Sequence, residues 1–322
     1  MTFAVRGIAV SFSIFALLYC ALSLAVCALW QIVRTGCCRY SAQRCVDVLF
    51  ALRMSPSVIA TAVTLVFAVP SFLLLEPRVA DEPMTAIPAV LAVCGIALIL
   101  AGIGKAIWAL TRASRMIARW SREASAMALV TVDGKIAVSL LPVAAAAPPL
   151  TAAGVFQPSV WLSCAAMSIL SEQELHRALR HEAEHVHRHD NLRKVMLCLV
   201  AFPGMAKLEN AWQEATEMAA DDAAVSSPSE ALDLAAAVIK LSRLAPLDSP
   251  PELTTALVHG PAASVNARVQ RLISWRAPTC VPKHSYVSTC VLCLAASAVA
   301  ALALSYPQLL LQVHAATEWL VR

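Results

Sequence analysis

The stretch Leu175-His176-Arg177-Ala178-Leu179-Arg180-His181-Glu182-Ala183-Glu184-His185-Val186 contains a His-Glu-x-x-His motif that decides how the rest of the chain is interpreted. Residues four positions apart share one face of a helix, so the imidazoles of His181 and His185 can converge on a single zinc ion. Glu182 then flanks the ion as the candidate general base. A Ser-x-x-Glu capping box at Ser171–Glu174, followed by apolar residues at helical spacing, predicts that the helix begins there.

A catalytic zinc site usually takes three protein ligands and leaves a fourth position for water. The downstream segment Glu217-Met218-Ala219-Ala220-Asp221 offers two carboxylates four positions apart. On one helix face, one of these carboxylates can reach the metal while the other accepts the N–H of a ligating histidine and fixes its tautomer. The neighbouring Asp222 points elsewhere and is expected at the surface. The sequence therefore predicts one zinc ion, held by His181, His185 and a carboxylate of this segment.

The composition predicts a membrane protein. Of the 322 residues, 59% are hydrophobic and 14% are charged, and the mean hydropathy is +0.69, which is too apolar for an ordinary soluble domain. A helix needs about 20 apolar residues to cross the hydrocarbon core of a bilayer. The stretches that come close to this length are Ile8–Trp30, Val58–Leu75, Ala86–Gly104 and Ser285–Tyr306.

Charged residues predict the orientation of these spans, because short cytoplasmic loops are enriched in lysine and arginine. The loop between the first two spans is basic and the next loop is mainly acidic; their residues are Arg34, Arg39, Arg44 and Arg53, then Glu76, Arg78, Asp81 and Glu82. We therefore expect a multi-pass protein of a bacterial-type inner (cytoplasmic) membrane, with the zinc motif in the cytoplasm and both termini outside. The net charge of +4 follows from such arginines and gives no reason to expect direct nucleic-acid binding.

The residues between the third span and the zinc motif predict a small sheet. Asp133-Gly134 lies between two apolar runs and is typical of a β-hairpin turn. Gly154–Leu162 is expected to be a strand that Pro158 confines to a sheet edge. Such an edge beside the zinc helix can hold an extended peptide by strand addition, and a plain edge covered by a loop is the alternative. The substrate-binding candidates are Val155, Phe156 and Gln157.

The segments His181–Leu192 and Glu217–Asp222 together resemble the BlaR/MecR-type antirepressor metallopeptidases. That family has three membrane helices, a cytoplasmic zinc domain with a His-Glu-x-x-His stretch and a later Glu-x-x-x-Asp, and a fourth membrane helix. Gly154–Ser163 is also similar to the strand that precedes the family's zinc helix. More distantly, the Glu-x-x-Ala-Asp form is similar to the prenyl-protein and heat-shock membrane zinc peptidases. The resemblance covers most of the chain and implies zinc ligands at His181, His185 and Glu217, the base at Glu182, and a ligand-orienting carboxylate at Asp221.

The resemblance implies an α-helical membrane protein with about four transmembrane helices and a mainly α, α+β zincin-like cytoplasmic metallopeptidase domain. Residues 1–110 would form the first membrane region, 111–284 the zinc domain, and 285–322 the fourth helix with a short outer tail. Sensor members of the family carry a penicillin-binding domain after the fourth helix. Only Gln308–Arg322 follow here, so β-lactam sensing is not expected.

Three positions depart from the family pattern. Glu184 stands where relatives usually have a small or apolar residue, and His187 and His189 stand among positions that are often arginine. Because His185 and His189 are four apart, a shifted site of His181, His185 and His189 is an alternative, but it would leave Glu217 idle. No spacing identifies the group that stabilises the oxyanion; His259 and Arg268 are the candidates.

The motif and the resemblance together predict a membrane zinc metalloendopeptidase that hydrolyses peptide bonds with zinc-activated water. The implied substrate is a cytoplasmic DNA-binding repressor or the peptidase itself, in regulated proteolysis for signal transduction at the bilayer. The alternatives are a quality-control protease for membrane proteins and a zinc-binding signalling scaffold without turnover. Glu182 argues against the scaffold, because a base is not needed merely to hold metal. Nothing in the sequence specifies an oligomeric state.

Overall fold

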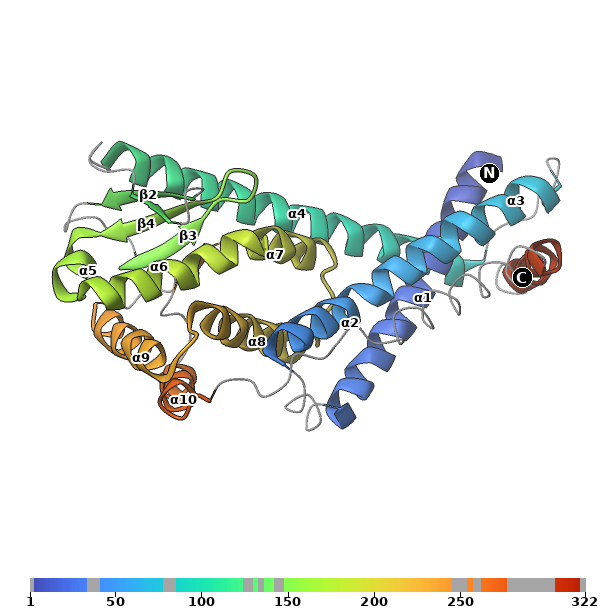
Figure 1. The fold of residues 1–322 in the computed structure, drawn as a ribbon. Helices are drawn as coiled ribbons and strands as arrows, with labels where there is room; N and C mark the ends of the chain where they lie inside the picture. Colours follow the sequence, from blue (N-terminus) through green and yellow to red (C-terminus); the bar gives the residue numbers. More distant parts are fainter. Residues whose placement is uncertain are drawn as a thin grey trace. The chain divides into compact units, whose positions relative to one another are not determined.

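The computed structural model describes residues 3–33, 41–77, 85–123, 130–132, 136–141, 148–244, 254–256, 262–276 and 305–318 (Figure 1). This part of the chain is mostly helical and contains one small five-stranded sheet. It forms two compact units, which are described separately below. The membrane unit comprises Met1–Gln31, Met54–Leu100 and Pro278–Arg322, and the motif unit comprises Ile32–Arg53 and Ala101–Ala277.

Long apolar helices dominate the membrane unit. Among the described residues, three helical spans are long and apolar enough to cross a membrane, namely Phe3–Gln31, Ala42–Leu75 and Ala86–Arg122. The helices that form them are α1 (Phe3–Val33), α2 (Ala42–Val63) with its continuations η2 (Thr64–Ala68) and α3 (Val69–Leu75), and α4 (Ala86–Glu123). They correspond to the first three predicted spans, but each is longer than its apolar stretch. Most of the predicted fourth span, residues 285–304, lies outside the described residues, and a helix covers residues 305–318.

Pro70 explains the irregular turn within the second span. Proline has no backbone N–H, so the carbonyl oxygen of Val66, four residues earlier, lacks its helical donor. The helix widens into the π-turn η2 at this point, and the Tyr306 hydroxyl donates a hydrogen bond of 2.8 Å to the Val66 oxygen. Ser71 Oγ similarly donates to the Leu310 oxygen at 3.2 Å. These two hydrogen bonds fasten the helix over residues 305–318 to the second span.

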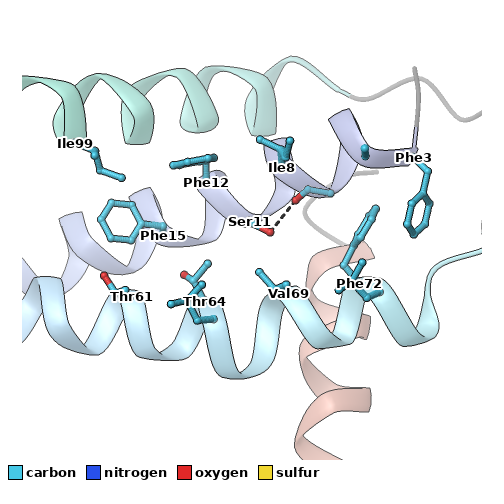
Figure 2. Close-up of a pocket in the computed structure, with 14 residues that line it drawn as sticks. Phe3, Ile8, Ser11, Phe12, Phe15, Thr61, Thr64, Val69, Phe72 and Ile99 are labelled. Carbon is cyan, nitrogen blue, oxygen red and sulfur yellow. Dashed lines mark hydrogen bonds between the residues drawn. The ribbon is translucent and has the colours of Figure 1, made fainter.

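The membrane unit also contains an apolar cavity of about 550 Å³ between α1, the second span and α4 (Figure 2). Aromatic and aliphatic side chains such as Phe12, Phe15 and Ile99 form much of its lining. The hydroxyl of Ser11 does not offer a free donor to the cavity, because it donates to the Gly7 oxygen at 2.7 Å. The lining therefore suits hydrocarbon rather than polar groups.

The motif unit is built around a mixed sheet with the order β1-β2-β4-β3-β5. Its strands are β1 (Val130–Val132), β2 (Ile136–Leu141), β3 (Leu150–Ala153), β4 (Ser159–Ser163) and β5 (Thr254–Ala256). Strands β1 and β2 pair antiparallel, which confirms the predicted hairpin. Strand β4 is parallel to β2 and antiparallel to β3, and β3 is antiparallel to β5.

The predicted strand Gly154–Leu162 is wrong in its first half. Residues 154–158 form the turn between β3 and β4, and Gly154 has φ +103°, a conformation that favours glycine. The strand begins only at Ser159, after Pro158. Since β4 is paired on both sides, proline does not mark a sheet edge here but the start of an inner strand.

Six helices complete the motif unit: α5 (Cys164–Ile169), α6 (Glu172–His187), α7 (Asp190–Leu199), α8 (Ala206–Ala224), α9 (Pro228–Ser242) and α10 (Ala262–Ile273). The helix with the zinc motif, α6, begins where the sequence predicts. Ser171 Oγ accepts the N–H of Glu174 at 3.3 Å, and Glu174 Oε2 accepts the N–H of Ser171 at 2.8 Å. This reciprocal pair is the predicted capping box.

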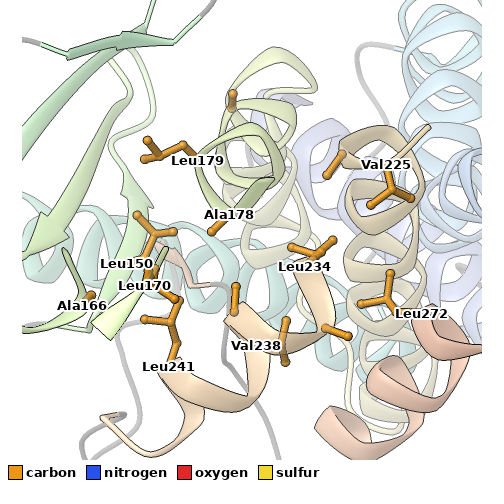
Figure 3. Packing of buried hydrophobic residues seen from close by; sticks show 14 of the residues in the cluster. Leu150, Ala166, Leu170, Ala178, Leu179, Val225, Leu234, Val238, Leu241 and Leu272 are labelled. Atoms are coloured by element: carbon orange, nitrogen blue, oxygen red, sulfur yellow. The ribbon is translucent and has the colours of Figure 1, made fainter. Parts of the chain in front are cut away.

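The core of the motif unit lies between the sheet and the helices α6, α9 and α10 (Figure 3). Alternate residues of β4 face opposite sides of the sheet. Val160 and Leu162 join this core, whereas Trp161 packs on the other side against Trp120 of α4, with 5.9 Å between ring centroids. The helix α6 is thus held against the sheet along its apolar face, which fixes the position of the motif residues.

The first turns of α2 belong to the motif unit and hold α8 in place. Arg53 is fully buried; its Nε donates to Glu209 Oε1 at 2.9 Å and its Nη2 to the Val200 oxygen at 2.6 Å. Phe50 packs against Trp212 of α8, with 6.3 Å between ring centroids. Helix α8, which carries Glu217, is therefore anchored at Glu209 and Trp212, within about two turns of Glu217.

Replacing the N-cap residue of α6 tests how firmly the capping box holds this helix. In Ser171→Ala, the N–H of Glu174 loses its acceptor, and we expect the free energy of unfolding to fall by about 1 kcal/mol. Thermal unfolding of the detergent-solubilised protein measures the change. Ser168→Ala is the control, because its exposed hydroxyl bonds only to the Ala165 oxygen and caps no helix. Equal melting temperatures for Ser171→Ala and the unmodified protein would contradict the assigned cap.

Candidate metal centre

Two helices bring the predicted ligand atoms together. Four-residue spacing on α6 places Nε2 of His181 and Nε2 of His185 only 3.2 Å apart. From α8, Glu217 Oε2 lies 3.5 Å from Nε2 of His181, and Glu217 Oε1 lies 3.6 Å from Nε2 of His185. Both imidazoles are buried, and the three side chains form a group able to hold a metal ion.

The second nitrogen of each imidazole faces a buried carboxylate. Nδ1 of His181 lies 3.0 Å from Asp221 Oδ1, one turn beyond Glu217 on α8. Nδ1 of His185 lies 2.8 Å from Asp190 Oδ2 at the start of α7. Each carboxylate favours a proton on Nδ1 and so leaves the Nε2 lone pair for a metal.

A strained turn places Asp190 beside His185. His189 has φ +53°, in the left-handed region that residues other than glycine seldom adopt. Only Arg188 and His189 separate the end of α6 from α7, and the turn places the Asp190 carboxylate beside His185. The His189 side chain itself is exposed, as is that of His187. The alternative site that would use His189 therefore does not match the structure.

Arg268 of α10 lies behind the carboxylates and binds both. Its Nε and Nη2 donate to Asp221 Oδ2 and Oδ1 at 2.9 and 2.6 Å, and its Nη1 lies 2.9 Å from Glu217 Oε2. Burial alone would raise the pKa of Glu217, but the Arg268 charge and the two histidines lower it to about 2. The same guanidinium outweighs burial at Asp221 and holds the pKa of that carboxyl well below its usual range. From the sequence, Arg268 is a candidate for oxyanion stabilisation. In the structure, its guanidinium instead binds the carboxylates of Glu217 and Asp221.

Glu182 is fully buried and faces β3. Its Oε2 accepts the backbone N–H of Ala152 at 2.8 Å, which fixes the carboxylate against β3. Burial raises the pKa of Glu182 to about 7, against the opposing charges of His185 and His181. A carboxyl group with this pKa can both accept and return a proton near neutral pH.

The donor set fits zinc. If both Nδ1 atoms carry protons toward Asp221 and Asp190, the two Nε2 atoms are acceptors that face each other at 3.2 Å and need a positive charge between them. Two imidazoles and one carboxylate are the ligand types of catalytic zinc sites. Burial alone would lower the pKa of His181, yet the carboxylates of Asp221 and Glu217 raise it to about 9. The pocket is thus arranged to stabilise positive charge.

Lys194 is a residue of this site that the sequence reasoning missed. It lies on α7 four residues after Asp190 and three after Asn191, on the helix face that meets the motif. Asn191 Nδ2 donates to the oxygen of Gly154 at 3.1 Å and so fixes this face against the end of β3. Burial lowers the pKa of the Lys194 ammonium, and the carboxylates of Glu217, Asp190 and Glu182 oppose that shift. In the sequence, Lys194 follows His185 by nine residues, and no motif marks this lysine as a site residue.

Of the remaining predicted residues, those that the structure describes are not part of the ligand group. Val155, Phe156 and Gln157 occupy the β3–β4 turn, where Phe156 is 85% exposed. His259 lies outside the described residues. Asp222 binds Arg271 at the surface, with 2.6 and 2.7 Å between Arg271 Nη2 and its carboxylate oxygens.

The chain matches no protein-family model and no curated protein.

Proposed function

We propose that this chain is a membrane-embedded zinc metalloendopeptidase with a zincin-like cytoplasmic domain, similar to the BlaR/MecR-type peptidases. The observation that carries the proposal is the convergence of two Nε2 atoms and one carboxylate, all within 4.8 Å of one another, next to the buried Glu182. A site that only held metal would not need a buried carboxyl group of raised pKa beside the ligands. The extra group favours a peptidase over a signalling scaffold.

In this mechanism His181, His185 and Glu217 would hold the zinc. A zinc ion held there would supply Lewis-acid chemistry, which would make water a nucleophile near neutral pH and polarise the scissile carbonyl. Glu182 accepts the proton of the attacking water and delivers it to the leaving amine. Asp221 and Asp190 keep the two imidazoles in one tautomer and orientation, and Arg268 keeps Glu217 and Asp221 ionised.

Lys194 is the group that we assign to the oxyanion in place of Arg268 or His259. The carboxylates of Glu182, Asp190 and Glu217, on α6, α7 and α8, favour its charged form and oppose the fall of its pKa on burial. A cation beside the base stabilises the negative charge that develops on the carbonyl oxygen in the transition state. Three nitrogens of Arg268 already bind the carboxylates of Asp221 and Glu217.

The place beside β3 that an extended peptide would take is occupied by β5 of the same chain. Strand β3 lies next to Glu182, and its outer side pairs antiparallel with β5, in the register Ala152 to Thr255. Strand addition of this kind is a common way to bind extended substrates. Because β5 belongs to the chain itself, this pairing favours the peptidase itself as one substrate. A cytoplasmic repressor is the other implied substrate, in regulated proteolysis, and membrane-protein quality control is the alternative.

Incubation of the detergent-purified chain with itself and with casein tests the proposal, with new termini identified by mass spectrometry. We expect cleavage that stops when a zinc chelator such as 1,10-phenanthroline is added and returns when zinc is restored. Cleavage that persists in the chelator would contradict a zinc peptidase. Absence of cleavage in every substrate, with zinc still bound, would favour the scaffold.

Substitution of Lys194 tests the oxyanion assignment. In Lys194→Met we expect kcat to fall by about 10²- to 10³-fold, as for the loss of one oxyanion donor, while KM and zinc content stay near those of the unmodified enzyme. Steady-state hydrolysis of a fluorogenic peptide provides the measurement. Lys207→Met is the control, since Lys207 is exposed at the start of α8. An unchanged kcat in Lys194→Met would remove Lys194 from the mechanism.

A further inference from the structure

A second group of potential metal ligands lies in the membrane unit, far along the chain from the motif. Glu76 follows the last turn of α3, and His314 and Glu318 are four residues apart on the helix over residues 305–318. Each of the three residues offers one ligand atom, and these atoms lie within 4.8 Å of one another. Four-residue spacing on a helix puts His314 and Glu318 on one face, as it does His181 and His185.

The two nitrogens of the His314 ring face different carboxylates, at separations longer than those of hydrogen bonds. His314 Nδ1 lies 3.9 Å from Glu76 Oε2, and His314 Nε2 lies 3.6 Å from Glu318 Oε1. Hydrogen bonds to a ring nitrogen are about 2.7–3.2 Å long. The value of 3.6 Å equals the separation of His185 Nε2 and Glu217 Oε1 at the candidate metal centre.

Burial makes the group costly without a ligand. The Glu76 side chain is only 8% exposed. Nδ1 of His314 is buried and has no hydrogen-bond partner in the described part of the chain. A buried polar atom without a partner costs about 1–3 kcal/mol, so it usually marks a missing ion or water.

The local charge also favours a cation. Arg6 of α1 binds Glu76 through Oε1, with 3.0 Å between Nη2 and that oxygen, and leaves Oε2 toward His314. A divalent cation could be held by these carboxylate oxygens and one ring nitrogen, and imidazole with carboxylate oxygens suits first-row metals such as zinc.

This group lies at the C-terminal end of the second span, whereas the basic loop precedes the N-terminal end of that span. The span Ala42–Leu75 contains 34 residues; at 1.5 Å per residue it is about 50 Å long, more than the hydrocarbon thickness of about 30 Å. Glu76 therefore emerges on the face opposite to residue 42. By the charge distribution of the loops, this is the outer face.

We propose that Glu76, His314 and Glu318 form a second divalent-cation site, which faces the outside of the membrane and binds zinc from the medium. One ring nitrogen and the two carboxylates supply the ligands, and water completes the coordination. The bound ion would join the helix over residues 305–318 to the end of the second span, which the hydrogen bonds of Tyr306 and Ser71 already bring together. The site does not depend on the proposed peptidase activity.

Zinc stoichiometry of the full-length chain in detergent tests this site. We expect one equivalent that survives gel filtration, from the candidate metal centre, and a second that appears on titration with zinc, measured by isothermal titration calorimetry. The double variant His314→Ala/Glu318→Ala should lose only the titratable equivalent, and His181→Ala only the retained one. His176→Ala, an exposed histidine of α6, should change neither.

The outcomes separate this proposal from the peptidase proposal. If His314→Ala/Glu318→Ala titrates like the unmodified chain, the second site is wrong whatever happens at His181. Glu318→Gln keeps the side-chain volume, and the Glu318 side chain is 43% exposed, so this variant should fold like the unmodified chain. A change in its zinc titration then reports on the site and not on misfolding. In right-side-out vesicles, EDTA, which does not cross a bilayer, should remove only the second equivalent. Protection of that equivalent from EDTA would contradict an outward-facing site.

Discussion

Glu182→Gln should abolish peptide hydrolysis while the fold and the zinc content are preserved. The amide keeps the volume of the side chain, and its oxygen can still accept the N–H of Ala152. It cannot accept the proton of the attacking water. General acid–base groups contribute about 10²- to 10⁴-fold to rate, so we expect kcat to fall by that factor, equivalent to about 3–5 kcal/mol of transition-state stabilisation.

Glu184→Gln is the matched control for this substitution. Glu184 lies on the same helix two residues later, on a different face, and lies outside the ligand group. Hydrolysis of a fluorogenic peptide by both variants, with zinc measured in parallel, gives the comparison. Equal rates for Glu182→Gln and Glu184→Gln would rule out Glu182 as the base, because zinc alone would then explain the activity.

Arg268→Met should destabilise the motif unit more than any other single substitution at the site. Arg268 is buried, and its removal leaves the carboxylates of Asp221 and Glu217 without their cation. Breaking a buried ion pair by removal of one partner costs about 3–5 kcal/mol. For a protein of this size, that corresponds to a fall in Tm of roughly 10 °C. Thermal unfolding in the presence of a zinc chelator measures the effect without a contribution from metal binding.

The pair Arg271 and Asp222 provides an internal control on the same two helices. Its contacts are as short, at 2.6 and 2.7 Å, but the side chains are 36% and 38% exposed. Exposed ion pairs contribute about 0–1 kcal/mol, so Arg271→Met should change Tm by at most about 3 °C. Similar melting temperatures for the two methionine variants would show that burial of Arg268 has no special cost, contrary to the structure.

The helices were predictable because their signals are local. The capping box at Ser171 and the periodic apolar residues after it set the start of α6, and both appear in the structure. Four-residue spacing likewise allowed the sequence to place His181 with His185, and Glu217 with Asp221, on common helix faces. The three long apolar helices follow from hydropathy alone.

The sheet was harder to predict because its pairing depends on distant residues. Strand β3 is Leu150–Ala153, which has few β-branched residues, yet it lies at the centre of the site because β4 and β5 pair with it. Pro158 suggested an edge strand, but proline just before a strand is equally compatible with an inner one. A strand over residues 154–158 would need an extended backbone at Gly154, but Gly154 has a positive φ.

The charged residues that support the ligands were also invisible to local patterns. Arg268 lies 47 residues from Asp221 and meets it only because α10 packs beside α8. Asp190 lies within the segment His181–Leu192, but its contact with His185 requires the left-handed turn at His189. Lys194 had no signal beyond its helix face. Such contacts between residues distant in the sequence can be identified only from the folded structure.

Zinc content of the purified chain, after gel filtration in detergent, tests the central claim most directly. The unmodified chain and Glu182→Gln should each retain about one zinc, whereas His185→Ala and Glu217→Ala should retain little or none, because each removes one of three protein ligands. This pattern would establish His181, His185 and Glu217 as the metal ligands and separate holding the metal from catalysis. Retention of a full equivalent in Glu217→Ala, or none in the unmodified chain, would contradict the proposed centre.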